Sequence, residues 1–164
     1  MPILPLSPTR VLSDFINSGG SRGVSPIKFL KELQELLPGC PLHEMVDLAC
    51  RSSLGGLTAL SMFHLYWPID VYSKTFKSLS AINYAVTNII YNKSILETIL
   101  KEIYSSKRAF FAHVPNTIQG PKVAVTVITQ GSQHAIFMNY NASTKIFQED
   151  ATRVVARATS IVLI

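Results

Sequence analysis

The sequence is short of cysteine, short of charge and free of long apolar runs, and each shortage excludes a class of protein. Its two cysteines, Cys40 and Cys50, form neither a Cys-x-x-Cys pair nor the Cys/His pattern of a zinc site. We therefore expect two reduced thiols in a cytosolic protein. No apolar run approaches the roughly 18–20 residues of a membrane-spanning helix. The first ten residues hold three prolines and no basic n-region, which argues against a signal peptide.

Charged residues make up 15% of the chain and hydrophobic residues 48%, so the sequence is not that of a disordered protein. Its 164 residues fit one domain. The apolar share favours a buried parallel sheet, or a surface that is normally covered. The net charge of +5 leaves a nucleic-acid partner, an anionic lipid surface and an ordinary solvated surface open. Because the basic residues are scattered, with no run longer than Lys107–Arg108, we expect no nucleic-acid partner.

Hydrophobic periodicity predicts strands that alternate with helices. Strands are expected at 11–16, 45–50, 122–129 and 134–140, and helices at 25–37, 57–66, 69–106 with a break near 91–93, and 149–160. A glycine-rich loop follows the first strand, and a tight turn at 51–56 follows the second. This order is typical of βαβα units. It predicts an α/β fold with three layers, α/β/α, around a mostly parallel sheet.

Two of these helices carry predictions at single residues. Ser25 offers an N-cap to the first helix, with Pro26 at the first helical position. Asp150 is expected to help begin the last helix. That helix is predicted to pack through Val154, Val155 and Ala158.

The loop Ser18-Gly19-Gly20-Ser21-Arg22-Gly23 stands between a predicted strand and a predicted helix. Glycines expose backbone N–H groups there, at the positive end of the helix, and this arrangement can bind an anion. A dinucleotide phosphate is disfavoured because G-x-G-x-x-G is absent, and a nucleoside triphosphate because Gly-Lys-Ser/Thr is absent. The oxyanion of an acyl-transfer intermediate remains, beside the alternative of a plain tight turn.

Ser53 lies between the strand 45–50 and the helix 57–66, in the frame x-x-Ser-x-Gly. This is the topology of a nucleophile elbow, in which a sharp turn raises a serine hydroxyl above the sheet. Gly55 and its neighbour Gly56 would let the helix approach the strand closely. The usual motif has a glycine two positions before the serine, where this chain has Arg51. The alternative interpretation is a simple serine N-cap.

Together, these two motifs resemble the patatin-like phospholipases, particularly their fungal members. That family reads Asp-Gly-Gly-Gly-x-Arg-Gly after its first strand, and this chain has Asn17-Ser18-Gly19-Gly20-Ser21-Arg22-Gly23 in register. The family's elbow, Asp-Leu-Ile-Gly-Gly-Thr-Ser-Thr-Gly-Gly-Leu, is similar to Asp47-Leu48-Ala49-Cys50-Arg51-Ser52-Ser53-Leu54-Gly55-Gly56-Leu57. Ala156-Arg157-Ala158-Thr159-Ser160 is similar to its Ala-Arg-Ala-Thr-Ser-Ala helix. The resemblance spans about residues 11–160.

The resemblance implies a patatin-like domain over 11–164, with 1–10 as an N-terminal extension. Ser53 would be the nucleophile of a Ser–Asp dyad. Backbone N–H groups around Gly19, Gly20 and Ser21 would form the oxyanion hole, with Arg22 anchoring a loop that ends at Gly23. The substrate would be a lipid acyl ester, a phospholipid or an acylglycerol. No cofactor and no metal are expected.

The dyad aspartate of that family lies in an Asp-Gly turn beyond the Ala-Arg-Ala-Thr-Ser helix, and the sequence stops before it. None of the four aspartates, Asp14, Asp47, Asp70 and Asp150, precedes a glycine. The domain is therefore expected to be partial. His113 and His134, the later histidines, are substitute candidates for the base, although a lone histidine is more often structural. Arg51 is expected to add strain in place of glycine.

Three functions follow in order of preference. The first is a lipid acyl hydrolase with weak or no turnover, in the cytoplasm and in peripheral contact with anionic membranes. The second is a catalytically dead lipid-binding or interaction module with the same fold. The third is a nucleotide-binding α/β domain that uses the glycine-rich loop, and it is disfavoured because no acidic ribose partner and no phosphate-binding lysine stand at the expected places.

Overall fold

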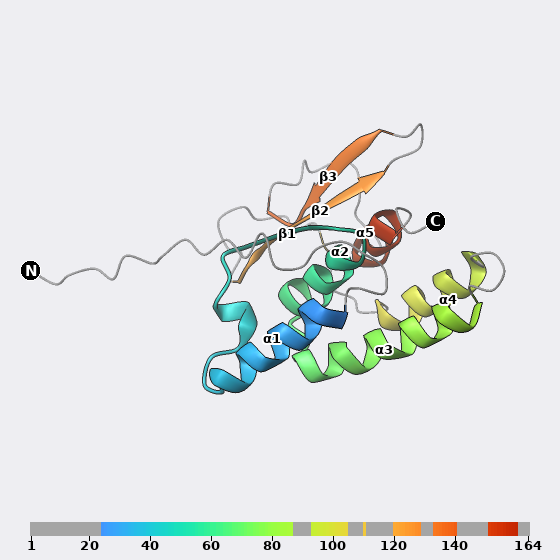
Figure 1. Cartoon of the computed structure of the whole chain (residues 1–164). Coiled ribbons are helices and arrows are strands. Elements are labelled where there is room, and N and C mark those ends of the chain that lie inside the picture. The colour runs from blue at the N-terminus through green and yellow to red at the C-terminus, as the bar shows by residue number, and fades with distance from the viewer. Residues whose placement is uncertain are drawn as a thin grey trace, which may run out of the picture.

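A computed structural model describes residues 24–86, 93–104, 110, 120–128, 133–140 and 151–160 of the chain. Its elements are shown in Figure 1. They are α1 (Val24–Leu36), the 3-10 helix η2 (Leu42–Glu44), β1 (Leu48–Ser52), α2 (Ser53–Ala59), the π-helix η3 (Leu60–His64), α3 (Ile69–Val86), α4 (Lys93–Ile103), β2 (Lys122–Ile128), β3 (His134–Met138) and α5 (Ala151–Ser160). The predicted strand 11–16, the loop 17–23 and Asp150 lie outside the described residues.

The three strands form one sheet in the order β1-β2-β3. β1 and β2 are parallel, with Ser52 opposite Thr126, and β3 is antiparallel to β2, with Thr126 opposite Ile136. The described sheet is thus mixed, and the prediction of a mostly parallel sheet is wrong for it. The cause is the short connection, since five residues separate Ile128 from His134, whereas a parallel crossover needs a dozen or more.

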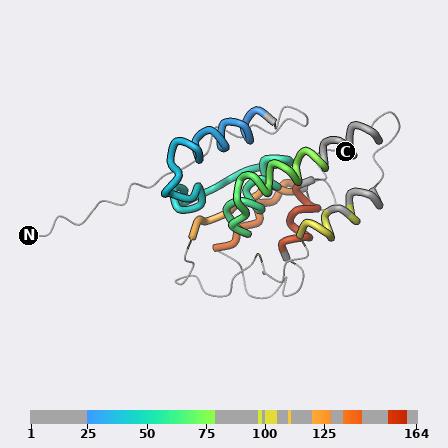
Figure 2. Tube along the Cα trace, turned by 90° about the horizontal axis from the view of Figure 1, so that it is seen from below, coloured from blue at the N-terminus to red at the C-terminus, as the bar shows by residue number. Residues whose placement is uncertain are grey.

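Helices cover one face of this sheet. In Figure 1, α1, α2, α3 and α4 lie below the strands, with α5 beside α2. Figure 2 shows the same arrangement from below, with α4 in yellow alongside α5 in red. An ion pair of 2.8 Å between Arg157 and Glu97 joins these two helices. A second helical layer, on the other face of the sheet, stays a prediction.

The core lies between β2 and the α2–η3 segment. Val123, Val125 and Val127 alternate along β2 and are at most 1% exposed, as expected for the face of a strand that packs on helices. Leu60 and Phe63 of η3 belong to the same cluster. Burying an aliphatic or aromatic side chain of this size contributes about 1.5–3 kcal/mol, so this contact is a main source of the fold's stability.

Three predicted boundaries differ from the structure. α1 begins at Val24, so Ser25 lies inside the helix and is not its cap. β1 begins at Leu48 and runs through Arg51 to Ser52, where a turn was predicted. Helix α2 follows at once from Ser53, so Gly55 and Gly56 are helical. The predicted strand at 45–50 and helix at 57–66 are confirmed as elements, with their junction moved.

The buried face of α5 also differs from the prediction. Val155 is fully buried as expected, but Val154 is 36% exposed. The buried positions are Thr152, Val155, Ala156 and Thr159, which follow the i, i+3, i+4, i+7 spacing of one helical face. Two of these four are threonines, which satisfy their hydroxyls inside the core. The prediction is thus confirmed for Val155 and for the part-buried Ala158, wrong for Val154, and it missed the two threonines of this face.

Two buried tyrosines connect α2 and η3 to the surrounding helices. The Tyr72 hydroxyl lies 2.7 Å from Oγ1 of Thr58. The Tyr104 hydroxyl lies 3.0 Å from Oγ of Ser61 and donates to the Leu57 carbonyl at 3.2 Å. Burial raises the pKa of both phenols, because a phenolate inside the core would carry a negative charge without hydration by water.

We predict that alkali destabilises the fold through these tyrosines. In the unfolded chain a phenol ionises near pH ~10, whereas the fold holds both in the neutral form. Stability is therefore fully present below about pH 10 and falls as the pH rises above it. Urea unfolding at intervals from neutral to strongly alkaline pH measures this slope. The double variant Tyr72→Phe, Tyr104→Phe should flatten it, and an unchanged slope would show that other groups, such as lysines, cause the loss.

Candidate functional site

The junction of β1 and α2 places Ser53 in an uncommon backbone conformation. Ser52, the last residue of the strand, is extended, and Ser53 begins the helix with a φ of +52°. Left-handed backbone at a residue other than glycine costs about 1–2 kcal/mol. Such strain is concentrated at functional sites. The N-cap position belongs to Ser52, whose side chain makes no capping bond, so the alternative of a serine N-cap does not describe Ser53.

Arg51 does not carry the strain that the sequence led us to expect. It lies within β1 opposite Val125, and the left-handed residues other than glycine in the described part of the chain are Ser53 and Tyr66. The Arg51 side chain is only 9% exposed, and its Nη1 donates to the Cys50 carbonyl at 2.6 Å. The expected strain at Arg51 is therefore a wrong prediction, because an extended strand accommodates any side chain at this position.

Gly56 is the glycine on which the junction depends. A Cβ at this position would lie 2.6 Å from Oγ1 and 2.9 Å from Cγ2 of Thr159 on α5. The Thr159 hydroxyl in turn donates to the Thr126 carbonyl at 2.9 Å. Thr126 is paired with Ser52, so this contact holds α2, α5 and β2 together beside the serine. We call the three residues Gly56, Thr159 and Thr126 the clamp.

The hydroxyl of Ser53 makes no side-chain hydrogen bond to the part of the chain that the structure describes, and Ser53 is 3% exposed. Asp47 lies at the opposite end of β1, roughly 20 Å away at about 3.3 Å per residue. Asp70 pairs with Lys31 at 2.9 Å. Neither aspartate stands beside the serine as a base.

The remaining predicted site residues divide into two groups. The oxyanion-loop residues Gly19, Gly20, Ser21, Arg22 and Gly23 lie outside the described residues, as do Asp14 and His113. His134 is described, and it is an exposed residue at the start of β3. β3 is two strands from β1, so roughly 10 Å separates their backbones. The structure does not bring His134 together with Ser53.

Two buried polar residues were missed in the sequence. His64, 4% exposed, has Nε2 3.2 Å from Oγ1 of Thr152, and its ring meets that of Phe110 edge-on at 5.1 Å. Thr159 forms the clamp. The available signal was the spacing of Thr152 and Thr159 with Val155 on one face of α5. Among the described residues, no group of three or more His, Cys, Asp or Glu side chains could hold a metal ion, and no helix there is both long and apolar enough to cross a membrane.

Several curated proteins similar to this chain are phospholipases. The chain is 30% identical over 142 residues to calcium-independent phospholipase A2-gamma of Oryctolagus cuniculus. It is 28% identical over 148 residues to the Homo sapiens protein of that name, and 28% identical over 82 residues to phospholipase A I of Arabidopsis thaliana. These alignments cover 76%, 80% and 50% of this chain.

The chain spans only a small part of these relatives, 17%, 18% and 6% of their lengths respectively. No family model matches the chain. No solved structure matches it significantly.

We predict that Gly56→Ala destabilises the fold by about 1–3 kcal/mol, because the new methyl group has no room beside Thr159. Thr159 is a short, buried side chain, and moving it breaks its bond to Thr126. Gly39→Ala is the matched control, since nothing lies within 4 Å of a Cβ there, and it should change stability by less than about 0.5 kcal/mol. Urea unfolding measures both variants.

A double-mutant cycle with Thr159→Ala checks the cause. Removing the threonine side chain should relieve the clash, so that Gly56→Ala costs less in that background. An equal cost in both backgrounds would place the origin of the destabilisation outside the clamp.

Proposed function

We propose that this chain is part of a patatin-like serine hydrolase domain that cleaves acyl esters of lipids, either phospholipids or acylglycerols, with Ser53 as the nucleophile. The observation that carries the proposal is the left-handed Ser53 at the turn from β1 into α2. A nucleophile elbow requires this combination of strained backbone and strand-to-helix turn. The similarity to phospholipases supports the choice of a lipid ester as substrate.

The chemistry proposed for this serine has two steps. Ser53 Oγ bonds to the acyl carbon, the ester C–O bond breaks, and the hydroxyl proton passes through a base to the departing alcohol. Water then attacks the acyl-enzyme and releases the carboxylic acid. Backbone N–H groups at Gly19, Gly20 and Ser21 are proposed to stabilise the oxyanion. The loop that carries them also contains Arg22, its proposed anchor, and Gly23.

Turnover depends on a base for Ser53, since an unassisted serine hydroxyl is a weak nucleophile. Among the described residues, Asp47 and Asp70 do not stand beside it. Without a base in reach, the same elbow would serve a second candidate function, a lipid-binding or interaction module that does not turn over. In either case we propose a cytoplasmic protein that contacts anionic lipid surfaces peripherally, because its net charge is +5.

A serine-directed fluorophosphonate probe separates the two candidates. We expect slow labelling of the chain that is abolished by Ser53→Ala, because Ser53 is the proposed nucleophile. Ser52→Ala is the matched control, since Ser52 is the neighbouring serine in ordinary extended backbone, and it should label like the parent. Labelling that survives Ser53→Ala would contradict the nucleophile assignment, and a complete lack of labelling in the parent would favour the non-catalytic module.

We further predict that the chain hydrolyses p-nitrophenyl esters poorly or not at all. Removing one member of a nucleophile–base unit in serine hydrolases typically lowers the rate by about 10⁴–10⁶. The assay compares the parent chain with Ser53→Ala. Clear turnover by the parent that is lost in the variant would show that another residue acts as base, and His113→Ala and His134→Ala would then identify it.

A further inference from the structure

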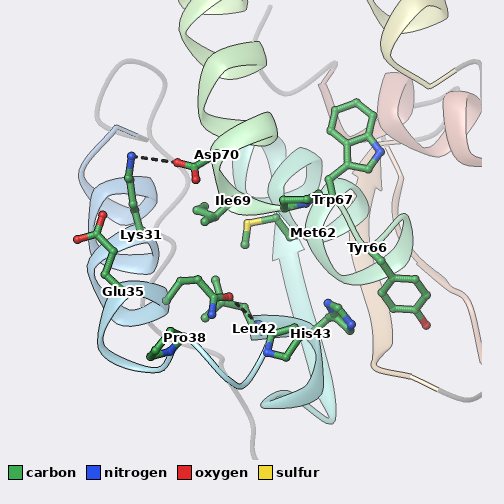
Figure 3. A pocket seen from close by; sticks show the side chains of 13 residues that line it. Lys31, Glu35, Pro38, Leu42, His43, Met62, Tyr66, Trp67, Ile69 and Asp70 are labelled. Carbon is green, nitrogen blue, oxygen red and sulfur yellow. Dashed lines mark hydrogen bonds and ion pairs between the residues drawn. The ribbon is translucent and has the colours of Figure 1, made fainter.

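A concave site lies away from the serine. An open cavity of about 560 Å³ is bordered by the second half of α1, by η2 and by the turn that joins η3 to α3, as Figure 3 shows. Met62 lines it, nine residues after Ser53 along the α2–η3 segment. At 1.5 Å per residue this separation is roughly 13 Å. The cavity is therefore distinct from the elbow, at the other end of the same helical segment.

The floor of the cavity is apolar. Leu42, Met62 and Ile69 line it and are each at most 6% exposed. Three prolines, Pro38, Pro41 and Pro68, form part of its wall, and proline has no backbone N–H to offer a ligand. An apolar floor with few polar groups is typical of a small-molecule site, and this one favours a ligand with an apolar body.

Charge is confined to the side formed by α1 and the start of α3. Lys31 and Asp70 form an ion pair there at 2.9 Å. Glu35 follows Lys31 by one helical turn and forms no ion pair within the described part of the chain. The bond to Asp70, and then the charges of Asp70 and Glu35, raise the pKa of Lys31, so it stays protonated. Two carboxylates against one ammonium leave this side with a surplus negative charge.

Gln34 cannot supply further recognition, although it lines the cavity. Its Nε2 donates to the Leu37 and Cys40 carbonyls, both at 3.0 Å, and its Oε1 accepts from the Leu42 N–H at 3.1 Å. These bonds hold the turn after α1 in place. They leave recognition of a charged ligand to Glu35 and Asp70.

Aromatic rings form the opposite side. The His43 and Tyr66 rings meet with centroids 4.8 Å apart, and Trp67 stacks on Tyr104. The Tyr66 hydroxyl packs directly against Gly120, since a Cβ there would collide with it. Except for that of Tyr104, these rings line the side of the cavity that lies away from Glu35 and Asp70.

We propose that this cavity binds a small amphiphile whose ammonium group lies against Glu35 and Asp70 and whose apolar part covers Leu42, Met62 and Ile69. The ammonium group could belong to a free alkylamine or to the headgroup of a lipid. The rim discriminates against a carboxylate, which would meet two like charges. The proposal does not depend on Ser53 as a nucleophile.

Trp67 makes the test direct, because it lines the cavity and is the only tryptophan of the 164-residue chain. Its fluorescence is followed during titration with octylammonium, octanoate and octanol, which share one alkyl chain, below their micellar concentrations. We expect octylammonium to give a saturable change and octanoate to bind at least about tenfold more weakly, a difference of about 1.4 kcal/mol. Tighter binding of dihexanoylphosphatidylcholine than of octylammonium would identify a lipid headgroup as the source.

Two variants test whether the Glu35 carboxylate binds the ammonium group. Glu35→Gln should weaken octylammonium binding by about two- to fivefold, the size of a part-exposed ion pair. Glu32→Gln is the control, because Glu32 lies on the same helix, pairs with Lys28 at 3.9 Å and does not line the cavity; it should bind as the parent does. Calorimetry on Trp67→Phe confirms binding without the fluorophore.

Three results would overturn the proposal: no saturable binding of octylammonium, binding of octanoate as tight as that of octylammonium, or no effect of Glu35→Gln. The titration is repeated on Ser53→Ala, where we expect the same affinity. A failure here is thereby distinguished from a failure of the hydrolase assignment, since the latter is decided by probe labelling alone.

Discussion

The contact between Gly56 and Thr159 is the constraint on which the rest of this structure depends. It lets α2 lie close to α5, and the bond from Thr159 to the Thr126 carbonyl carries that approach through to the sheet. Because Thr126 is the partner of Ser52, the clamp lies beside the turn that places Ser53. A strained turn persists only when its surroundings over-determine it, and the clamp is the nearest feature that does so.

Hydrogen bonds inside the core also fix the position of α2. Thr58 bonds both to the Leu54 carbonyl and to the Tyr72 hydroxyl, and Tyr104 bonds to the Leu57 carbonyl. The first turns of α2 are thus tied to α3 and α4 as well as to α5. Each such bond contributes only about 1 kcal/mol net, but together they fix one orientation of the helix, which an apolar contact alone would leave free to slide.

Much of this arrangement could be predicted from the sequence, because hydrophobic periodicity over a long segment indicates whether it is a helix or a strand. The helix at 25–37, the two strands at 122–129 and 134–140, and two helices within the stretch 69–106 were all found. Tyr91 and Asn92 of the predicted break lie outside the described residues. The junction at 51–56 was predicted as a tight turn in which Gly55 and Gly56 let the helix approach the strand. In the structure Gly56 allows a close contact with another helix, and the residue that it contacts, Thr159, lies more than a hundred positions away. No local pattern reveals such a partner.

The candidate site could be predicted only in part, because it too depends on a long-range contact. Ser53 was found from its neighbours, Gly55 and Gly56, whereas the strain was assigned to Arg51 and lies on Ser53 itself. The sequence motif marks which residues take part, but the backbone angle follows from where the strand ends and the helix begins. That boundary depends on the pairing of Ser52 with Thr126 across the sheet, which is a long-range contact.

The two left-handed residues other than glycine in the described chain, Ser53 and Tyr66, stand at opposite ends of one helical segment. Ser53 begins α2 at the elbow, and Tyr66 follows η3 at the cavity, where the Trp67 N–H bonds to the Ser61 carbonyl. Between them the helix widens into a π-helix. Such helices are rare in proteins, and those that occur are often found at functional sites. Left-handed backbone just after the end of a helix, as at Tyr66, is a common way for a helix to terminate. At the start of a helix it is uncommon, so the strain at Ser53 is the one that calls for a reason, and the proposed elbow would supply it.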